Sequence, residues 1–190
     1  MHMMRTPPLM TSEEFLGLPD DGTERWLDKG VVRETDEMKM RNRMRSTVMA
    51  RIVIVLGIWL GRQPEPRGEI LCGEAGFHLR DDPDTDAGVD VAYVSAELLA
   101  RQTTARTIVV GVPVLAVEIL SPSTSQADLH DKVRAYREAG TPLVWVVDPE
   151  DRTVRIYQAG AEPVLVNATQ ALDGGPHLPG FSVPVAQLFP

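Results

Sequence analysis

Cysteine is almost absent: Cys72 is the only one among 190 residues. One cysteine cannot form a disulfide within the chain or supply a cysteine-based zinc cluster, which fits a reducing compartment, so we expect a cytoplasmic protein. With 43% hydrophobic and 24% charged residues, the composition is that of an ordinary globular protein. We therefore predict a single domain over 1–190 with a full-sized core, in which residues 1–10 are flexible.

Long apolar runs are also missing. The longest, 52–60, is far shorter than a membrane span, and the N-terminus lacks the basic-then-apolar order of a signal peptide. We therefore expect no membrane association.

Basic residues are outnumbered by acidic ones, 19 to 27, and the net charge is −8. This argues against a protein that coats nucleic acid by bulk electrostatics. It does not exclude a nuclease, because acidic metal-binding clusters add negative charge and a local basic patch can hold the backbone. Such a patch lies within 39–51, where Arg41, Arg43 and Arg45 are candidates to contact DNA. An equally good interpretation is the solvated face of a helix.

The apolar periodicity predicts an α/β domain with a central mixed sheet. A long helix over 38–60 is expected to bury one apolar stripe and to carry the basic residues on its polar side. A hairpin is predicted over 26–33. A second helix is predicted to begin after its N-cap, Ser125, and to end at Gly140. Further strands are expected at 69–79, 89–94, 114–120, 143–147 and 154–157, with an acidic turn over 81–86.

Two carboxylates, Asp90 and Glu118, interrupt apolar strands. A charge inside a buried strand is costly unless it is paired or binds a metal. If the two strands are neighbours, the carboxylates can share Mg²⁺ or Mn²⁺, with the backbone carbonyl of Ile119 as a third oxygen ligand. Lys132 lies beside the buried stripe of the next helix, from which its ammonium could reach the strand end and assist the water or the phosphate.

Three motifs surround these residues: V-E-I-L-S-P-S-T at 117–124, D-L-H-D-K-V-R-A-Y at 128–136 and W-V-V-D-P at 145–149. Together they resemble the Uma-two family of restriction-type endonucleases, a branch of the PD-(D/E)XK nuclease superfamily. The resemblance is close over 88–158 and looser over 11–79. It implies a restriction-endonuclease-like fold, with a mixed central sheet flanked by helices, and a Mg²⁺- or Mn²⁺-dependent endonuclease that acts on DNA.

By this resemblance the catalytic residues are Asp90, Glu118 and Lys132, with the lysine moved from the strand to the helix. Nucleases of this type often act as dimers, since cutting both strands needs two sites. The chain departs from the family at Val89, where a proline is usual, and near Arg45, where a histidine is usual. Glu34 is a further candidate acid.

Plainer interpretations of the same residues remain. Glu118 could be a sheet-edge carboxylate paired with Lys132 or an arginine, and Lys132 could pair with Asp128 one turn earlier. The second hypothesis for the whole chain is therefore a catalytically inactive module that kept the nuclease fold and binds protein or nucleic acid.

Other motifs in the sequence do not indicate a functional site. Asp82, Asp84 and Asp86 alternate as in a calcium loop, but the glycine and the closing glutamate are out of place, which predicts a solvated turn. The histidines lack paired-ligand spacing. No G-x-S-x-G motif surrounds Ser121, which argues against a serine hydrolase.

Overall fold

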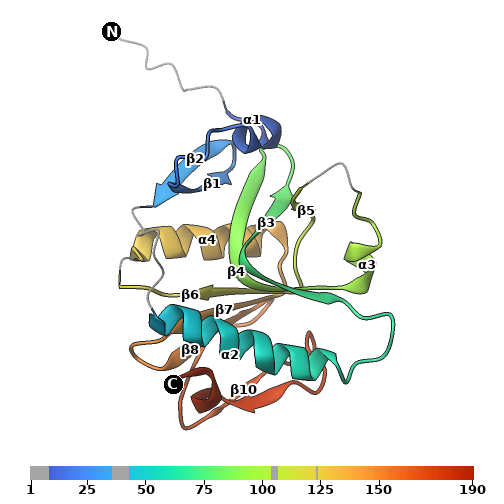
Figure 1. Cartoon of the computed structure of the whole chain (residues 1–190), viewed down its shortest axis with the longest axis vertical. Helices are drawn as coiled ribbons and strands as arrows, with labels where there is room; N and C mark the ends of the chain where they lie inside the picture. Colours follow the sequence, from blue (N-terminus) through green and yellow to red (C-terminus); the bar gives the residue numbers. More distant parts are fainter. Residues whose placement is uncertain (1–8, 36–42, 104–106, 123) are drawn as a thin grey trace.

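The structure, a computed structural model, describes residues 9–35, 43–103, 107–122 and 124–190. Its centre is a nine-stranded mixed sheet with the order β2-β1-β4-β6-β7-β8-β9, in which β3 pairs with β4 and with β5 (Figure 1). The strands are β1 (Glu24–Asp28), β2 (Val31–Thr35), β3 (Glu69–Arg80), β4 (Thr85–Val94), β5 (Val109–Val110), β6 (Leu115–Ile119), β7 (Leu143–Asp148), β8 (Thr153–Gln158) and β9 (Val164–Asn167). A small second sheet pairs β10 (Ala171–Asp173) with β11 (Ser182–Pro184).

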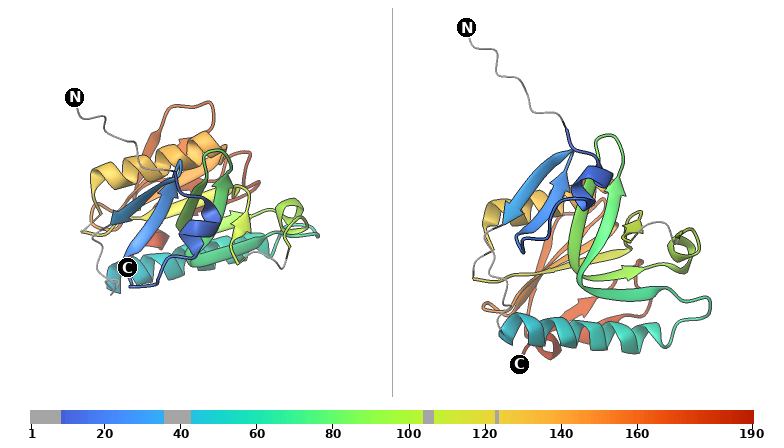
Figure 2. Two further views of the ribbon diagram at one scale, coloured as in Figure 1. Left: turned by 90° about the horizontal axis from the view of Figure 1, so that it is seen from above. Right: turned by 45° about the horizontal axis from the view of Figure 1, so that its top comes forward.

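Two long helices cover opposite faces of the central strands (Figure 2). They are α2 (Arg43–Leu60) and α4 (Gln126–Ala139), and the shorter helices are α1 (Ser12–Leu16), α3 (Ala96–Leu99) and η1 (Val185–Leu188). This architecture confirms the predicted fold class. Within the described ranges, no helix is long and apolar enough to cross a membrane.

The core has two layers because every residue of β6 is buried and successive side chains point to opposite faces. Val117 and Ile119 belong to the layer that packs on α2, together with Trp145 of β7. Ala116 belongs to the layer that packs on α4. Glu118 alternates with Val117 and Ile119, so it points to the α4 side, as predicted.

Local signals in the sequence account for the ends of α1 and α4. Thr11 and Glu14 form a capping box at the start of α1. The Ser125 hydroxyl accepts a hydrogen bond from the Asp128 amide at 3.0 Å, and Gly140 ends α4 with φ of 96°. These ends set the phase of α4 and hence the side chains that it directs at the sheet.

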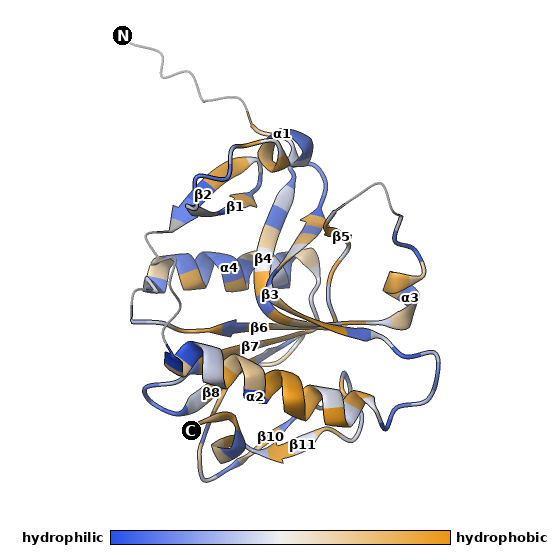
Figure 3. Cartoon of the chain, in the orientation of Figure 1, coloured by the Kyte–Doolittle hydropathy of each residue, from blue (hydrophilic) through white to orange (hydrophobic). Residues whose placement is uncertain are grey.

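The structure differs from the sequence prediction at the first turn of α2. We expected all basic residues on its polar side, but Arg45 is only 4% exposed. It lies three residues before Val48 and seven before Ile52, so helical periodicity places it on the buried stripe. The predicted first turns, from residue 38, lie outside the described residues. Figure 3 shows that the later turns of α2 are largely apolar.

The β3–β4 hairpin is also longer than predicted. Thr85 and Asp86, expected in a turn, begin β4 and are buried, so the prediction of a solvated turn was wrong for Asp86. The Ser12 hydroxyl donates a hydrogen bond to Asp86 Oδ2 at 2.5 Å, and His78 Nδ1 lies 2.6 Å from Asp86 Oδ1. Partners distant in sequence therefore make burial of this carboxylate possible.

Candidate active site

Strand pairing brings Asp90 and Glu118 together. β4 and β6 are antiparallel neighbours with Val91 opposite Val117, so the same register places Asp90 opposite Glu118. Both residues are buried, with exposed fractions of 1% and 5%. The Ile119 amide donates a hydrogen bond to Asp90 Oδ2 at 2.8 Å, which ties one carboxylate to the strand of the other. The sequence analysis required the strands of Asp90 and Glu118 to be neighbours if the two carboxylates share a site. The structure meets this condition.

Helix α4 supplies Lys132 and Tyr136, which lie one turn apart and face the same carboxylate. Lys132 Nζ is 3.3 Å from Glu118 Oε2, and its ammonium lies 5.7 Å from the centre of the Trp26 ring. The Tyr136 hydroxyl donates to Glu118 Oε1 at 2.6 Å and is 3.2 Å from the Gly88 carbonyl oxygen. Both oxygens of Glu118 therefore have a partner on α4.

Glu74 is a third carboxylate of the site, and the sequence analysis missed it. It lies in β3 where the register with β4 shifts between Cys72 and Ala75, and its φ is 63°. Such bulges are frequent beside active sites because they redirect a side chain. The signal that could have revealed it is a glutamate inside a strand and next to Gly73, whose φ is 83°.

Arg45 joins Glu74 to Asp90. Its Nη2 atom is 2.7 Å from Asp90 Oδ1, 2.9 Å from Asp90 Oδ2 and 3.4 Å from Glu74 Oε1. Of the three arginines proposed to contact DNA, this one lies inside the protein. Arg43 is exposed at the start of α2, and Arg41 lies outside the described residues.

The buried acids hold their protons more tightly than usual. Burial, with the nearby charge of Glu118, raises the pKa of Asp90 to about 8, although Arg45 opposes the shift. Burial also raises the pKa of Glu118, against the influence of Lys132 and of the Tyr136 hydrogen bond. Among the described residues, Arg45 opposes the shift at Asp90 and Lys132 opposes the shift at Glu118. Perturbed carboxyl groups of this kind are typical of functional sites.

The donor set suits a hard divalent cation. Asp90, Glu118 and Glu74 offer only oxygen atoms, which Mg²⁺ and Mn²⁺ prefer. The carbonyl group of Ile119 belongs to the residue that follows Glu118 and adds a neutral oxygen of the same kind. The chemistry of these donors thus fits the ion that the sequence led us to expect, while the ligand atoms of the three carboxylates do not all lie within 4.8 Å of one another in this structure.

A second group of potential ligands lies at the turn of the β3–β4 hairpin. One ligand atom each of His78, Asp81 and Asp84 lies within 4.8 Å of the others. His78 Nε2 is 3.0 Å from Asp81 Oδ1, and Asp84 Oδ2 accepts from the Ser12 amide at 2.6 Å. Burial lowers the pKa of His78, but the hydrogen bonds to Asp81 and Asp86 outweigh it and raise the value. We interpret this group as an ion pair within the hairpin, His78 with Asp81, together with a hydrogen bond that joins Asp84 to α1.

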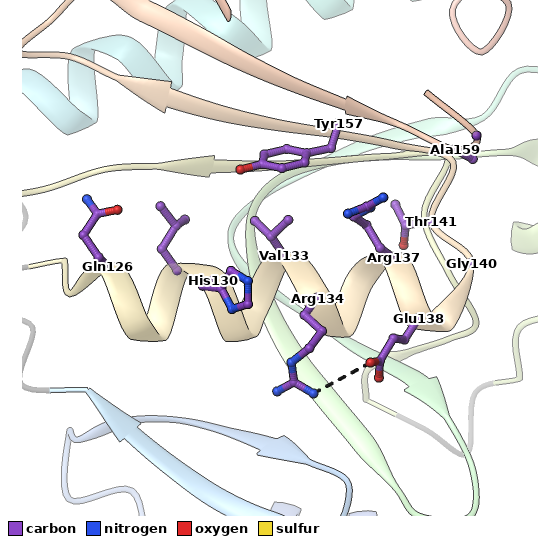
Figure 4. Close-up of a pocket in the computed structure, with 12 residues that line it drawn as sticks. Gln126, His130, Val133, Arg134, Arg137, Glu138, Gly140, Thr141, Tyr157 and Ala159 are labelled. Carbon is purple, nitrogen blue, oxygen red and sulfur yellow. Dashed lines mark ion pairs between the residues drawn. The ribbon is translucent and has the colours of Figure 1, made fainter. Parts of the chain in front are cut away.

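Two hollows lie near these elements. The larger, about 610 Å³, opens between α4 and β8 beside Arg137 and Tyr157 (Figure 4). It is on the side of α4 turned away from Glu118 and does not include the carboxylates. The smaller, about 210 Å³, lies between α1 and the β3–β4 hairpin and is lined by Glu74 and Gly88. The smaller hollow therefore adjoins the candidate site.

The fold is one known from a nuclease-type protein. The structure matches a crystal structure of a "putative nuclease belonging to DUF820" from Anabaena variabilis, with a TM-score of 0.76 and 19% sequence identity. The match covers 94% of this chain and 97% of the other. At this identity the match establishes the fold alone.

Comparison of the sequence with family models identifies the family. The Uma2 model, whose description is "Putative restriction endonuclease", matches residues 12–186. The chain therefore belongs to the Uma2 family, as the motifs at 117–149 predicted. No curated protein matches the sequence.

Proposed function

We propose that the protein is a divalent-metal-dependent endonuclease that hydrolyses phosphodiester bonds of DNA. The observation that carries this proposal is the pair of buried carboxylates, Asp90 and Glu118, which face each other across adjacent strands with Lys132 at 3.3 Å from Glu118. Membership of a family described as restriction endonucleases supports the same reaction class. Carboxylates grouped in this way otherwise carry a large desolvation cost.

Each residue has a role in this proposal. Asp90, Glu118 and the Ile119 carbonyl would hold Mg²⁺ or Mn²⁺, which would supply positive charge to offset the charge that develops on the phosphate. Lys132 positions the attacking water or stabilises the charge that develops on the phosphate. Tyr136 fixes the orientation of Glu118 through its 2.6 Å hydrogen bond.

The wider proposal concerns substrate and assembly. The exposed Arg43, together with Arg41, is proposed to contact the DNA backbone, whereas Arg45 serves the site itself. A homodimer would provide the two sites needed to cut both strands. The free thiol of Cys72 is exposed, which fits a reducing, cytoplasmic setting.

One observation favours the second candidate, an inactive module that binds protein or nucleic acid. Arg45 holds both oxygens of Asp90, and a carboxylate satisfied by an arginine has no need of a metal ion. The two candidates make opposite predictions for metal binding, so one experiment separates them.

The experiment is a calorimetric titration of Mg²⁺ or Mn²⁺ into the wild type and Glu118→Gln, with a plasmid-nicking assay on the same samples. Glutamine keeps the size of the side chain, and Glu150→Gln removes an equal charge from an exposed turn as the control. We expect the wild type and the control to bind metal and nick DNA, and Glu118→Gln to lose both. A folded wild-type protein that binds no metal would refute the enzyme proposal and favour the binding module.

A further inference from the structure

Arg45 is placed at the site by the main core of the protein. It begins the buried stripe of α2, which continues through Val48, Ile52, Leu56 and Trp59. These residues pack on the central sheet, so α2 cannot rotate to expose Arg45 without disrupting this layer. The guanidinium group is therefore held over Asp90 by the helix and not by a mobile loop.

The contacts of Arg45 are those of a counter-ion. Its Nη2 atom lies within 2.9 Å of both oxygens of Asp90, and Glu74 is a second, weaker partner at 3.4 Å. Asp90 Oδ2 also accepts from the Ile119 amide. A cation that binds Asp90 must therefore compete with a hydrogen-bonded guanidinium for the same oxygens.

The charges make this competition strong. When Asp90, Glu118 and Glu74 are all ionised they carry three negative charges, and among the described residues Arg45 and Lys132 are the cations in contact with them. A divalent ion placed beside Arg45 on the same carboxylate would bring two cations into contact in a buried site, where Coulomb repulsion is poorly screened. The ion and the guanidinium therefore compete for the oxygens of Asp90.

We propose that Arg45 is a built-in competitor of the divalent ion, which releases Asp90 only when the ion binds. Glu74 lies at the rim of the site, where its side chain is 24% exposed, and its Oε1 atom is already 3.4 Å from Arg45 Nη2. After Arg45 leaves Asp90, Glu74 retains the guanidinium. In this arrangement Arg45 keeps the buried acids compensated in the metal-free protein and weakens metal affinity. The inference rests on the proposed function, since it assumes that the ion binds at Asp90.

The test measures Mn²⁺ binding by electron paramagnetic resonance of the free ion, which does not depend on activity. Arg45→Gln removes the competitor, and Arg45→Lys keeps the charge with a single donor group in place of the planar fork. The control is Arg43→Gln, which removes the same charge from an exposed position on the same helix. We expect Arg45→Gln to bind Mn²⁺ at least about tenfold more tightly than the wild type, with Arg45→Lys in between. The control should match the wild type.

Each outcome of the Mn²⁺ titration either supports or refutes the competition between Arg45 and the ion. Unchanged or weaker binding by a folded Arg45→Gln, with binding by the wild type, would overturn this inference and leave the proposed function in place. Binding by Arg45→Gln alone would show that Arg45 never yields Asp90 to the ion in the wild type, and would overturn both this inference and the proposed function. If neither protein binds Mn²⁺, both the inference and the proposed function fail. Should Arg45→Gln not fold, the same comparisons apply to Arg45→Lys.

Discussion

Replacing Tyr136 by phenylalanine removes one oxygen atom from the centre of the site. The ring is fully buried, and phenylalanine fills almost the same space, so no large cavity is created. The change removes the 2.6 Å hydrogen bond to Glu118 Oε1 and the 3.2 Å approach to the Gly88 carbonyl oxygen. Any loss of stability therefore reports on these polar contacts.

The expected loss follows from the charge and burial of Glu118. A hydrogen bond to a charged group contributes about 1.5–3 kcal/mol, and a buried acceptor left without its donor carries a desolvation cost of similar size. We therefore expect Tyr136→Phe to lower the free energy of unfolding by about 2 kcal/mol. For a chain of this length that corresponds to a fall of about 4–8 °C in the melting temperature. The pKa of Glu118 should rise further, because the hydrogen bond that lowers it is lost.

The assay is urea unfolding of the wild type, Tyr136→Phe, Glu118→Gln and the double variant. Tyr157→Phe is the control, since that ring is only partly buried and stacks on Arg137. The cycle should show a coupling of about 1–2 kcal/mol between Tyr136 and Glu118. Coupling below about 0.5 kcal/mol would show that the hydroxyl does not hold the carboxylate, and would refute the positioning role.

Two further predictions concern the carboxyl group of Asp90 and the backbone at the start of β3. The folded-state pKa of Asp90, about 8, lies above its ordinary value of 3.8, so the folded protein binds the extra proton between these values. The free energy of unfolding should therefore fall as pH rises from about 5 to 8. In urea titrations at several pH values, Asp90→Asn should remove part of this pH dependence. An unchanged pH dependence would contradict the raised pKa of Asp90. In Gly68→Ala the new Cβ would lie 1.9 Å from the Val94 carbonyl oxygen, so the backbone must move, and we expect a loss of about 1–3 kcal/mol by thermal unfolding. Gly57→Ala, with open space around the new atom in α2, should instead stabilise the protein by about 0.5–1 kcal/mol, and equal effects of the two changes would refute this reasoning.

The sequence by itself determined the elements and the central residues of the candidate site. Capping residues and helical periodicity are local properties, so they placed α4 between Ser125 and Gly140 correctly. A carboxylate in an apolar strand is costly wherever the strand pairs, so Asp90 and Glu118 stood out without knowledge of the fold. The motifs around Glu118 also identified the family, which the family model confirmed.

Only the tertiary structure decided what surrounds these acids. The spacing of Arg45 from Val48 and Ile52 is compatible with the buried stripe of α2, but only the fold shows that Asp90 is the partner that makes burial of this charge possible. Glu74 reaches the site through a bulge in β3, and a bulge is a property of strand register that alternation cannot reveal. Asp86 is buried because Ser12, 74 residues away in sequence, and His78, its partner across the β3–β4 hairpin, satisfy its oxygens. These partners are set by strand register and by contacts between distant segments, which local sequence patterns do not reveal.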